Sequence, residues 1–164
     1  MKNKNIKNYL NQALIILGLF LIDQFTKYLI SSKFILGESK IIINGFFNLT
    51  YVRNTGAGFS ILEGHMAFFY LITVVALGLM FYLLKDAQKE SKLTRFAILL
   101  MIGGTLGNFF DRLINHYVID FLDFVILGWD FPVFNFADIC LTVGVFLFVI
   151  DMLFIQKKEG HSNA

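Results

Sequence analysis

The sequence predicts an all-α polytopic membrane protein, with four transmembrane helices, a small extracytoplasmic β-hairpin and a short interfacial helix. Two observations lead to this prediction. Of the 164 residues, 57% are hydrophobic and only 16% are charged, whereas soluble domains are about 45–50% apolar and about 25% charged. Four spanning helices of about 20 residues would occupy about 80 residues, which leaves no room for a separate soluble domain. We therefore expect one integral membrane domain, residues 1–164.

Apolar stretches supply the four expected helices. They cover approximately residues 9–30, 66–84, 96–112 and 136–155. The first follows three lysines and so imitates a secretory signal peptide, but its length and the lack of a small-residue cleavage site indicate a retained helix. The second contains no charged residue. The third is rich in glycine, which allows close contact between helices in lipid.

The basic residues predict how these helices are oriented. Nine of the fourteen lysines and arginines lie in the N-terminal tail, in residues 85–95 and in the C-terminal tail. Four spans place these three segments on one side, and the positive-inside rule makes that side cytoplasmic. Both termini are then expected in the cytoplasm, with residues 31–65 and 113–133 outside.

The two outer segments carry structural signals of their own. The dipeptide Asn44-Gly45 separates two short apolar runs, and it favours a hairpin because both residues accept the positive φ angles of a tight turn. Residues 117–129 are rich in apolar side chains and end at Trp129. We expect part of this segment to form a short helix in the interface, with the tryptophan at headgroup level.

Two outward aspartates, Asp120 and Asp138, are the strongest candidates for chemistry. Taken alone, Asp138 could simply favour a helix N-terminus, and Asp120 could be a solvated loop residue. The segment that joins them is short and apolar, so both are expected at the same depth near the outer surface. Close carboxylates share a proton, which suits one as base and the other as acid on a water molecule. A proton-carrying pair in a transporter is the alternative, although four short spans leave little room for alternating access.

Further polar residues have both a structural and a functional interpretation. Asp23 and Lys27 are four residues apart, so they could form a structural ion pair or belong to the site. Asn108 and Arg112 could present an amide and a guanidinium at the outer surface, or end a packing stripe with a snorkelling arginine. The glycine-rich residues 53–58 could let backbone approach a ligand, or be an ordinary loop.

The remaining reactive residues do not have the spacing of a metal site. Cys140 is expected to be a core thiol, and the three histidines lack metal-ligand spacing. A serine–lysine peptidase built on Lys27 is a weaker alternative, because no spacing favours any of its serines. The histidines and serines concerned are His65, His116, His161, Ser31, Ser32 and Ser60.

Five segments, in this order, resemble the lipoprotein signal peptidases, the type II signal peptidases of bacteria. The resemblance covers essentially the whole chain, and no motif position departs from the family pattern. The block from Gly103 to Arg112 is the most specific of the five. The segments are residues 23–27, 53–57, 103–112, 118–121 and 134–138.

The resemblance implies an intramembrane aspartic endopeptidase of the bacterial cytoplasmic membrane. Such an enzyme removes the signal peptide from diacylglyceryl-modified prolipoproteins, on the N-terminal side of the lipidated cysteine. The water-activating dyad would fall on Asp120 and Asp138, near the outer leaflet. The other family positions that line or support the site fall on Asp23, Lys27, Asn54, Gly56, Gly104, Asn108, Arg112 and Asn135.

The resemblance also carries expectations about structure and partners. The hairpin would correspond to an extracytoplasmic β-cradle, and the second outer segment to a periplasmic helix. No metal or organic cofactor is expected, and globomycin-type peptides are expected to inhibit. We expect a monomer in membrane lipid that binds no nucleic acid. A small membrane protein that binds lipid or a partner, or carries protons without catalysis, is the rival interpretation; it has no need of an outward carboxylate pair.

Overall fold

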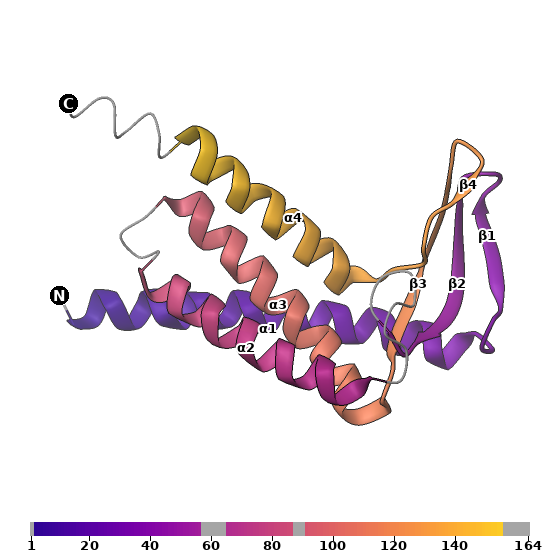
Figure 1. Ribbon diagram of the computed structural model, residues 1–164, viewed down its shortest axis with the longest axis horizontal. Coiled ribbons are helices and arrows are strands. Elements are labelled where there is room, and N and C mark those ends of the chain that lie inside the picture. Colours follow the sequence, from indigo (N-terminus) through magenta and orange to yellow (C-terminus); the bar gives the residue numbers. More distant parts are fainter. Residues whose placement is uncertain (1, 57–64, 87–90, 156–164) are drawn as a thin grey trace.

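The computed structural model describes residues 2–56, 65–86 and 91–155. Figure 1 shows the helices gathered in one bundle, with a small sheet at one end. The elements, in chain order, are α1 (Lys2–Lys33), β1 (Ser39–Ile43), β2 (Phe47–Asn54), α2 (Met66–Asp86), α3 (Lys92–Asn115), β3 (Val118–Ile126), β4 (Trp129–Asp130), α4 (Phe136–Ile150) and the π-helical turn η2 (Asp151–Ile155).

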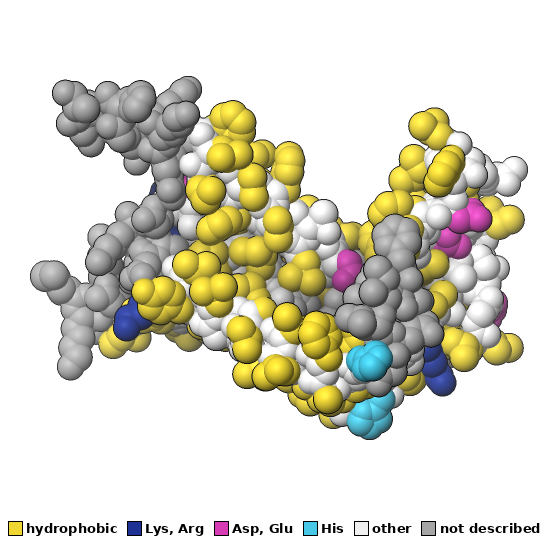
Figure 2. Space-filling view, viewed as in Figure 1, with side chains coloured by type: hydrophobic (Ala, Val, Ile, Leu, Met, Phe, Trp, Pro, Cys, Tyr) yellow, Lys and Arg dark blue, Asp and Glu magenta, His cyan; other side chains and the backbone are white. Residues whose placement is uncertain are grey.

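Within the described residues, four helices are long and apolar enough to cross a membrane. Their spans are Ile6–Lys33, Met66–Lys85, Lys92–Asn115 and Phe136–Phe154. Large hydrophobic side chains such as Leu71, Val75 and Phe146 are more than half exposed, and hydrophobic groups cover much of the helical surface in Figure 2. Because such a surface is stable only in lipid, the chain is a multi-pass membrane protein, as its composition predicts.

Helix α3 is the centre of the bundle and contacts α1, α2 and α4. Its N-cap is Ser91, whose hydroxyl accepts a 3.0 Å hydrogen bond from the backbone N–H of Thr94. Glycine makes the close packing possible, since a Cβ on Gly104 would overlap the carbonyl oxygen of Ala137 in α4. The predicted use of small residues for helix contact is confirmed.

The sheet is antiparallel, with the strand order β1-β2-β3-β4. Strands β1 and β2 form the predicted hairpin, with Ser39 opposite Thr50 and Ile43 opposite Phe47. Gly45 has a φ of +70° in the turn, which is the conformation that Asn-Gly favours. The hairpin prediction is confirmed.

The prediction of a short interfacial helix in residues 117–129 is wrong. Residues Val118–Ile126 form strand β3, and Trp129 lies in the short strand β4. The reason is pairing with a strand that is distant in the sequence. Strand β2 presents an open edge, and β3 pairs with it from Val118 opposite Asn54 to Phe124 opposite Phe47. β-Branched and aromatic residues in this segment suit a half-buried sheet better than a helix.

A small hydrophobic cluster fixes the sheet to the end of α1. It consists of Ile30 from the helix with Tyr51, Ile119 and Phe121 from β2 and β3. Successive side chains along a strand point to opposite faces of the sheet. Since Ile119 and Phe121 pack into this cluster, Asp120, which lies between them, points to the opposite face. The sheet therefore directs Asp120 toward the ends of the helices.

Candidate active site

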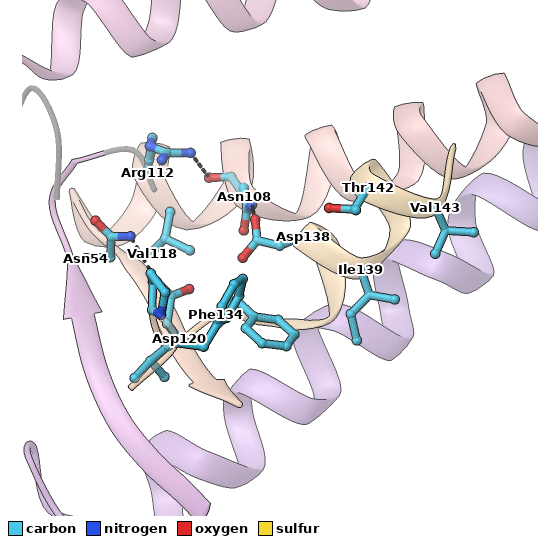
Figure 3. Close-up of a pocket in the computed structure, with 13 residues that line it drawn as sticks. Asn54, Asn108, Arg112, Val118, Asp120, Phe134, Asp138, Ile139, Thr142 and Val143 are labelled. Carbon is cyan, nitrogen blue, oxygen red and sulfur yellow. Dashed lines mark hydrogen bonds between the residues drawn. The ribbon is translucent and has the colours of Figure 1, made fainter. Parts of the chain in front are cut away.

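A cavity of about 440 Å³ lies where β2 and β3 meet the end of α3 and the start of α4. Figure 3 shows Asp120 and Asp138 on its wall, contributed by β3 and α4. The two carboxylates therefore line one cavity at the ends of the helices, while their depth near the outer membrane surface stays a prediction. The polar residues that line the cavity are Asn54, Asn108, Arg112, Asp120, Asp138 and Thr142.

Asp138 is held in place by the start of α4. Its Oδ2 accepts a 3.0 Å hydrogen bond from the backbone N–H of Asn135, and the Asn135 side chain accepts one of 3.1 Å from the backbone N–H of Asp138. This reciprocal pair is a capping box, which satisfies two helix-terminal donors. The other carboxylate oxygen accepts a 2.8 Å bond from Asn108 Nδ2, so both oxygens are fixed.

Asp120 is held by two amides. Its Oδ1 accepts a 2.6 Å hydrogen bond from Asn135 Nδ2, and its Oδ2 accepts one of 2.9 Å from Asn54 Nδ2. The residue is only 3% exposed. Asn135 thus links the two aspartates, because its side-chain oxygen accepts from the backbone N–H of Asp138 and its side-chain nitrogen donates to Asp120.

The surroundings of Asp120 favour its protonated form. Burial, and after it the negative charge of Asp138, raises the pKa of Asp120 from 3.8 to about 7. The hydrogen bonds from Asn54 and Asn135 act in the opposite direction, because they stabilise the ionised carboxylate. Asp120 therefore gains and loses its proton near neutral pH, which is the range in which a general acid or base works best.

A buried ion cluster lies behind the cavity. Lys27 Nζ lies 2.8 Å from Asp23 Oδ2 and 3.1 Å from Asp111 Oδ2, and it donates a 2.9 Å hydrogen bond to Asn108 Oδ1. Asp23 and Lys27 do not line the cavity. The geometry therefore favours the structural ion pair over direct participation, with Asn108 connecting the cluster to Asp138.

Asp111 is the member of this cluster that sequence reasoning did not single out. It is 1% exposed, and its Oδ2 also accepts a 3.1 Å bond from the backbone N–H of Ile119, at the start of β3. The available signal was its place three residues after Asn108, which puts both side chains on one face of α3.

Arg112 and Gly56 form a second support, on the β2 side. Arg112 Nη2 donates a 2.9 Å hydrogen bond to the carbonyl of Gly56, whose N–H donates one of 2.9 Å to Asn54 Oδ1. The guanidinium also lies 4.8 Å from the ring centroid of Phe69. These contacts orient the Asn54 amide toward Asp120. Residues 57 and 58 of the predicted glycine-rich segment lie outside the described residues.

Comparison with known proteins assigns a family to this geometry. Residues 15–154 match the family model described as signal peptidase (SPase) II. The chain belongs to the signal peptidase II family. It is 47% identical over 143 residues to the lipoprotein signal peptidase of Bacillus pumilus (strain SAFR-032), covering 87% of this chain and 92% of that one. It is 43% identical over 151 residues to the lipoprotein signal peptidase of Shouchella clausii (strain KSM-K16), covering 92% and 96%.

Solved structures agree with this assignment. The chain is similar to a bacterial membrane enzyme determined by the in meso method at 2.3 Å resolution, with a TM-score of 0.82 and 43% identity over 87% of each chain. A second such structure, at 1.9 Å, gives a TM-score of 0.80 and 42% identity over 88% of this chain and 94% of that one. The family resemblance predicted from the five motifs is confirmed, and the chain is a peptidase.

The glycines of the 103–112 motif in this signal peptidase II family member act through packing. Gly104 does not line the cavity; it lets α4 approach α3 closely. A Cβ on Gly107 would overlap the carboxylate of Asp23, so Gly107 makes room for the ion cluster. Their place in the motif therefore reflects how tightly the helices that carry Asn108 and Asp138 must pack.

The apolar wall of the cavity is the part that sequence reasoning largely missed. Phe134 stacks on Phe124 with ring centroids 5.7 Å apart, and its backbone pairs with Leu122 of β3. Ile139 and Val143 continue the wall along α4 and are 38% and 41% exposed. The full apolar lining is Val118, Phe131, Pro132, Val133, Phe134, Ile139 and Val143, with Thr142 beside them.

The serine–lysine alternative finds no support among the described residues. The hydroxyls of Ser31 and Ser32 donate to backbone carbonyls of α1, and the ammonium of Lys27 is committed to the ion cluster. Ser60 lies outside the described residues.

Proposed function

We propose that this chain is an intramembrane aspartic endopeptidase that removes the signal peptide from diacylglyceryl-modified prolipoproteins, on the N-terminal side of the lipidated cysteine. The observation that carries the proposal is that Asp120 and Asp138 line one cavity and are linked by Asn135. The names of the curated relatives supply the substrate class.

The two aspartates divide the chemistry between them. Asp120 is the more deeply buried and carries the shared proton. Ionised Asp138 takes a proton from water as the water oxygen attacks the scissile carbonyl carbon, and Asp120 gives its proton to the carbonyl oxygen. The tetrahedral intermediate then collapses: Asp138 passes its proton to the amide nitrogen, the C–N bond breaks, and Asp120 recovers its proton from the hydroxyl.

The polar supports prepare this geometry before substrate arrives. Asn108 holds Asp138, while Asn54 and Asn135 hold Asp120. Lys27 in turn fixes the side chain of Asn108, and Gly56 fixes that of Asn54. A preorganised site accelerates reaction because no groups need reorient in the transition state. Arg112 lines the cavity beside the dyad, where its guanidinium would bind a backbone carbonyl of the substrate.

The apolar wall suits a lipidated substrate. Ile139 and Val143 are partly exposed on the membrane-spanning helix α4 and line the cavity. Acyl chains that remain in the bilayer would lie against them while the scissile bond reaches the dyad at the end of the helix. Hydrophobic contact of this kind needs no dedicated lipid-binding domain.

The proposed orientation has both termini in the cytoplasm and the site near the outer leaflet. The N-terminus and the start of α3 lie at the end of the bundle opposite the sheet (Figure 1), and the lysines and arginines concentrate toward that end. Reporter fusions after Asp86 should read cytoplasmic, and a fusion near Gly45 should read outside. A cytoplasmic signal at Gly45 would contradict the orientation.

The decisive experiment is cleavage of a diacylglyceryl-modified lipobox peptide by the purified protein in detergent. We expect cleavage immediately before the lipidated cysteine, and little or none of the same peptide without the lipid. Equal cleavage of both peptides would overturn the substrate class, and no cleavage of either would overturn the activity.

A further inference from the structure

A second polar cavity lies at the end of the bundle remote from the dyad. It is a crevice of about 170 Å³ between α1 and α3. Its lining residues are Asn8, Asn11, Gln12, Ile15, Lys92, Arg95, Phe96 and Leu99. None of them belongs to the proposed catalytic machinery, so the crevice requires a separate account.

The crevice is amphipathic along the membrane normal. Helices α1 and α3 both begin at this end and run in the same direction (Figure 1), so higher residue numbers lie deeper in the membrane. The amides and cations occupy positions 8–12 and 92–95, while Ile15 and Leu99 lie about one turn deeper. The polar groups are thus at the membrane surface and the apolar groups beneath them, which matches an oriented amphiphile rather than a free solute.

Gln12 points independently to a ligand. Its side chain is 7% exposed, inside a membrane-spanning helix, and it makes no hydrogen bond to any residue that the structure describes. Its amide atoms are not among the fully buried unpaired atoms of the described residues, so they remain within reach of a bound molecule, and an amide left without a partner beside lipid is costly. Gln12 lines this crevice and also a cavity between α1 and α2, so a molecule bound in the crevice would lie within reach of its amide.

The charges of the crevice select an anion. Lys92 and Arg95 lie in the first turn of α3, which contains no acidic residue, although a helix N-terminus favours negative charge. Neither cation forms an ion pair with a carboxylate in the described part of the chain. An anion between them would offset their mutual repulsion and also interact with the helix dipole.

We propose that this crevice binds an anionic phospholipid, with its phosphate at Lys92 and Arg95 and its headgroup and glycerol oxygens at the amides of α1. Basic crevices between transmembrane helices are a known way to hold such headgroups. The acyl chains continue over Ile15, Phe96 and Leu99 into the bilayer. This site is separate from the dyad and does not rest on the proposed peptidase reaction.

The test is lipid binding to the delipidated full-length protein in detergent, followed by native mass spectrometry and by thermal unfolding. Phosphatidylglycerol, zwitterionic phosphatidylcholine and inorganic phosphate are the three probes. We expect phosphatidylglycerol to bind and stabilise far more than the other two. Equal effects of both lipids would overturn the proposal, and so would an equal effect of inorganic phosphate, which would indicate a simple anion site.

Charge variants locate the site. Removing Lys92 and Arg95 together, as K92Q with R95Q, should weaken phosphatidylglycerol binding about 25-fold, at about fivefold for each surface charge. Lys7→Gln is the matched control, because Lys7 is an exposed cation at the same end of the bundle that does not line the crevice. An equal loss in the control would mean general surface attraction and would overturn the proposal.

Gln12→Leu separates a binding role from a structural one. Since the amide has no partner in the protein, we expect the variant to melt at the same temperature as the parent, or higher, when lipid is absent. Its phosphatidylglycerol affinity should nevertheless fall. A lower melting temperature with unchanged lipid affinity would show that Gln12 serves the fold alone and would overturn its place in the site.

Discussion

Asn135 donates a 2.6 Å hydrogen bond to Asp120, from the helix cap that also fixes Asp138. The asparagine is fully buried, so its amide cannot turn to a different partner without leaving a polar group unsatisfied. One residue therefore sets both the start of α4 and the relative position of the two carboxylates. Helix capping and alignment of the dyad are consequently coupled.

Two substitutions at Asn135 can separate helix capping from alignment of the dyad. Serine still caps a helix, whereas alanine does not, and the lost cap costs about 1 kcal/mol. Neither supplies the amide that binds Asp120. We expect both variants to lose about 10²-fold in kcat, because misplaced groups forfeit alignment, while only Asn135→Ala loses appreciable thermal stability. Peptide cleavage and thermal unfolding measure the two effects; full activity in Asn135→Ser would refute the alignment role.

The dyad itself is tested by near-isosteric substitution. Asp120→Asn and Asp138→Asn should each fold and insert, yet each should lower cleavage by at least about 10²–10⁴-fold, the usual value of general acid–base catalysis. The double variant should be hardly worse than either single one, because the two residues act as a unit. Cleavage of the lipidated peptide is measured at matched protein levels.

Two other aspartates serve as controls for the dyad. Asp130 is exposed in β4, and Asp123 binds the Thr50 hydroxyl at 2.5 Å on the sheet. Neither lines the cavity, so Asp123→Asn and Asp130→Asn should keep substantial activity. Full activity in Asp120→Asn or Asp138→Asn would defeat the aspartic mechanism.

The ion cluster behind the dyad predicts an asymmetric response to charge removal. With Lys27 between Asp23 and Asp111, the cluster has a formal charge of −1. Lys27→Gln leaves two buried carboxylates without a cation and should cost about 3–5 kcal/mol. Adding Asp23→Asn returns the cluster to −1 and should restore part of the loss. Thermal unfolding and membrane yield measure this, and no restoration in the double variant would contradict the ion-pair interpretation.

Much of the fold could be predicted because the bilayer dictates it. A run of about 20 apolar residues has few alternatives to a spanning helix, and Asn44-Gly45 specifies its turn locally. The joint placement of Asp120 and Asp138 followed from the short apolar segment between them. These features depend on residues that are close in sequence.

Features that depend on distant segments could not be predicted in the same way. Strand β3 exists because β2, some 70 residues earlier, offers it an edge, as the pairing of Asn48 with Asp123 shows. The third partner of Lys27 comes from another helix, so periodicity along α1 does not point to Asp111. The wall at Phe134 likewise depends on its pairing with Leu122.

The raised pKa of Asp120 predicts how the protein responds to pH. Burial first, and the charge of Asp138 second, raises the pKa of Asp120 from 3.8 to about 7. The native state therefore holds this proton over a pH range in which the unfolded chain has released it. The resulting stabilisation is complete below about pH 3.8 and disappears as the pH rises to about 7. If Asp120 is the acid, kcat/KM should also fall above about pH 7.

Infrared titration of the carboxyl stretch can follow the Asp120 proton directly, with Asp120→Asn identifying the band. In the parent protein the band should disappear near pH 7. In Asp138→Asn it should disappear at lower pH, because that substitution removes the negative charge that raises the pKa of Asp120. The shift should be partial, since burial is the larger cause and remains in the variant. A band that titrates at the same pH in both proteins would show that the two carboxylates are not coupled, and an uncoupled pair could not share a proton during peptide hydrolysis.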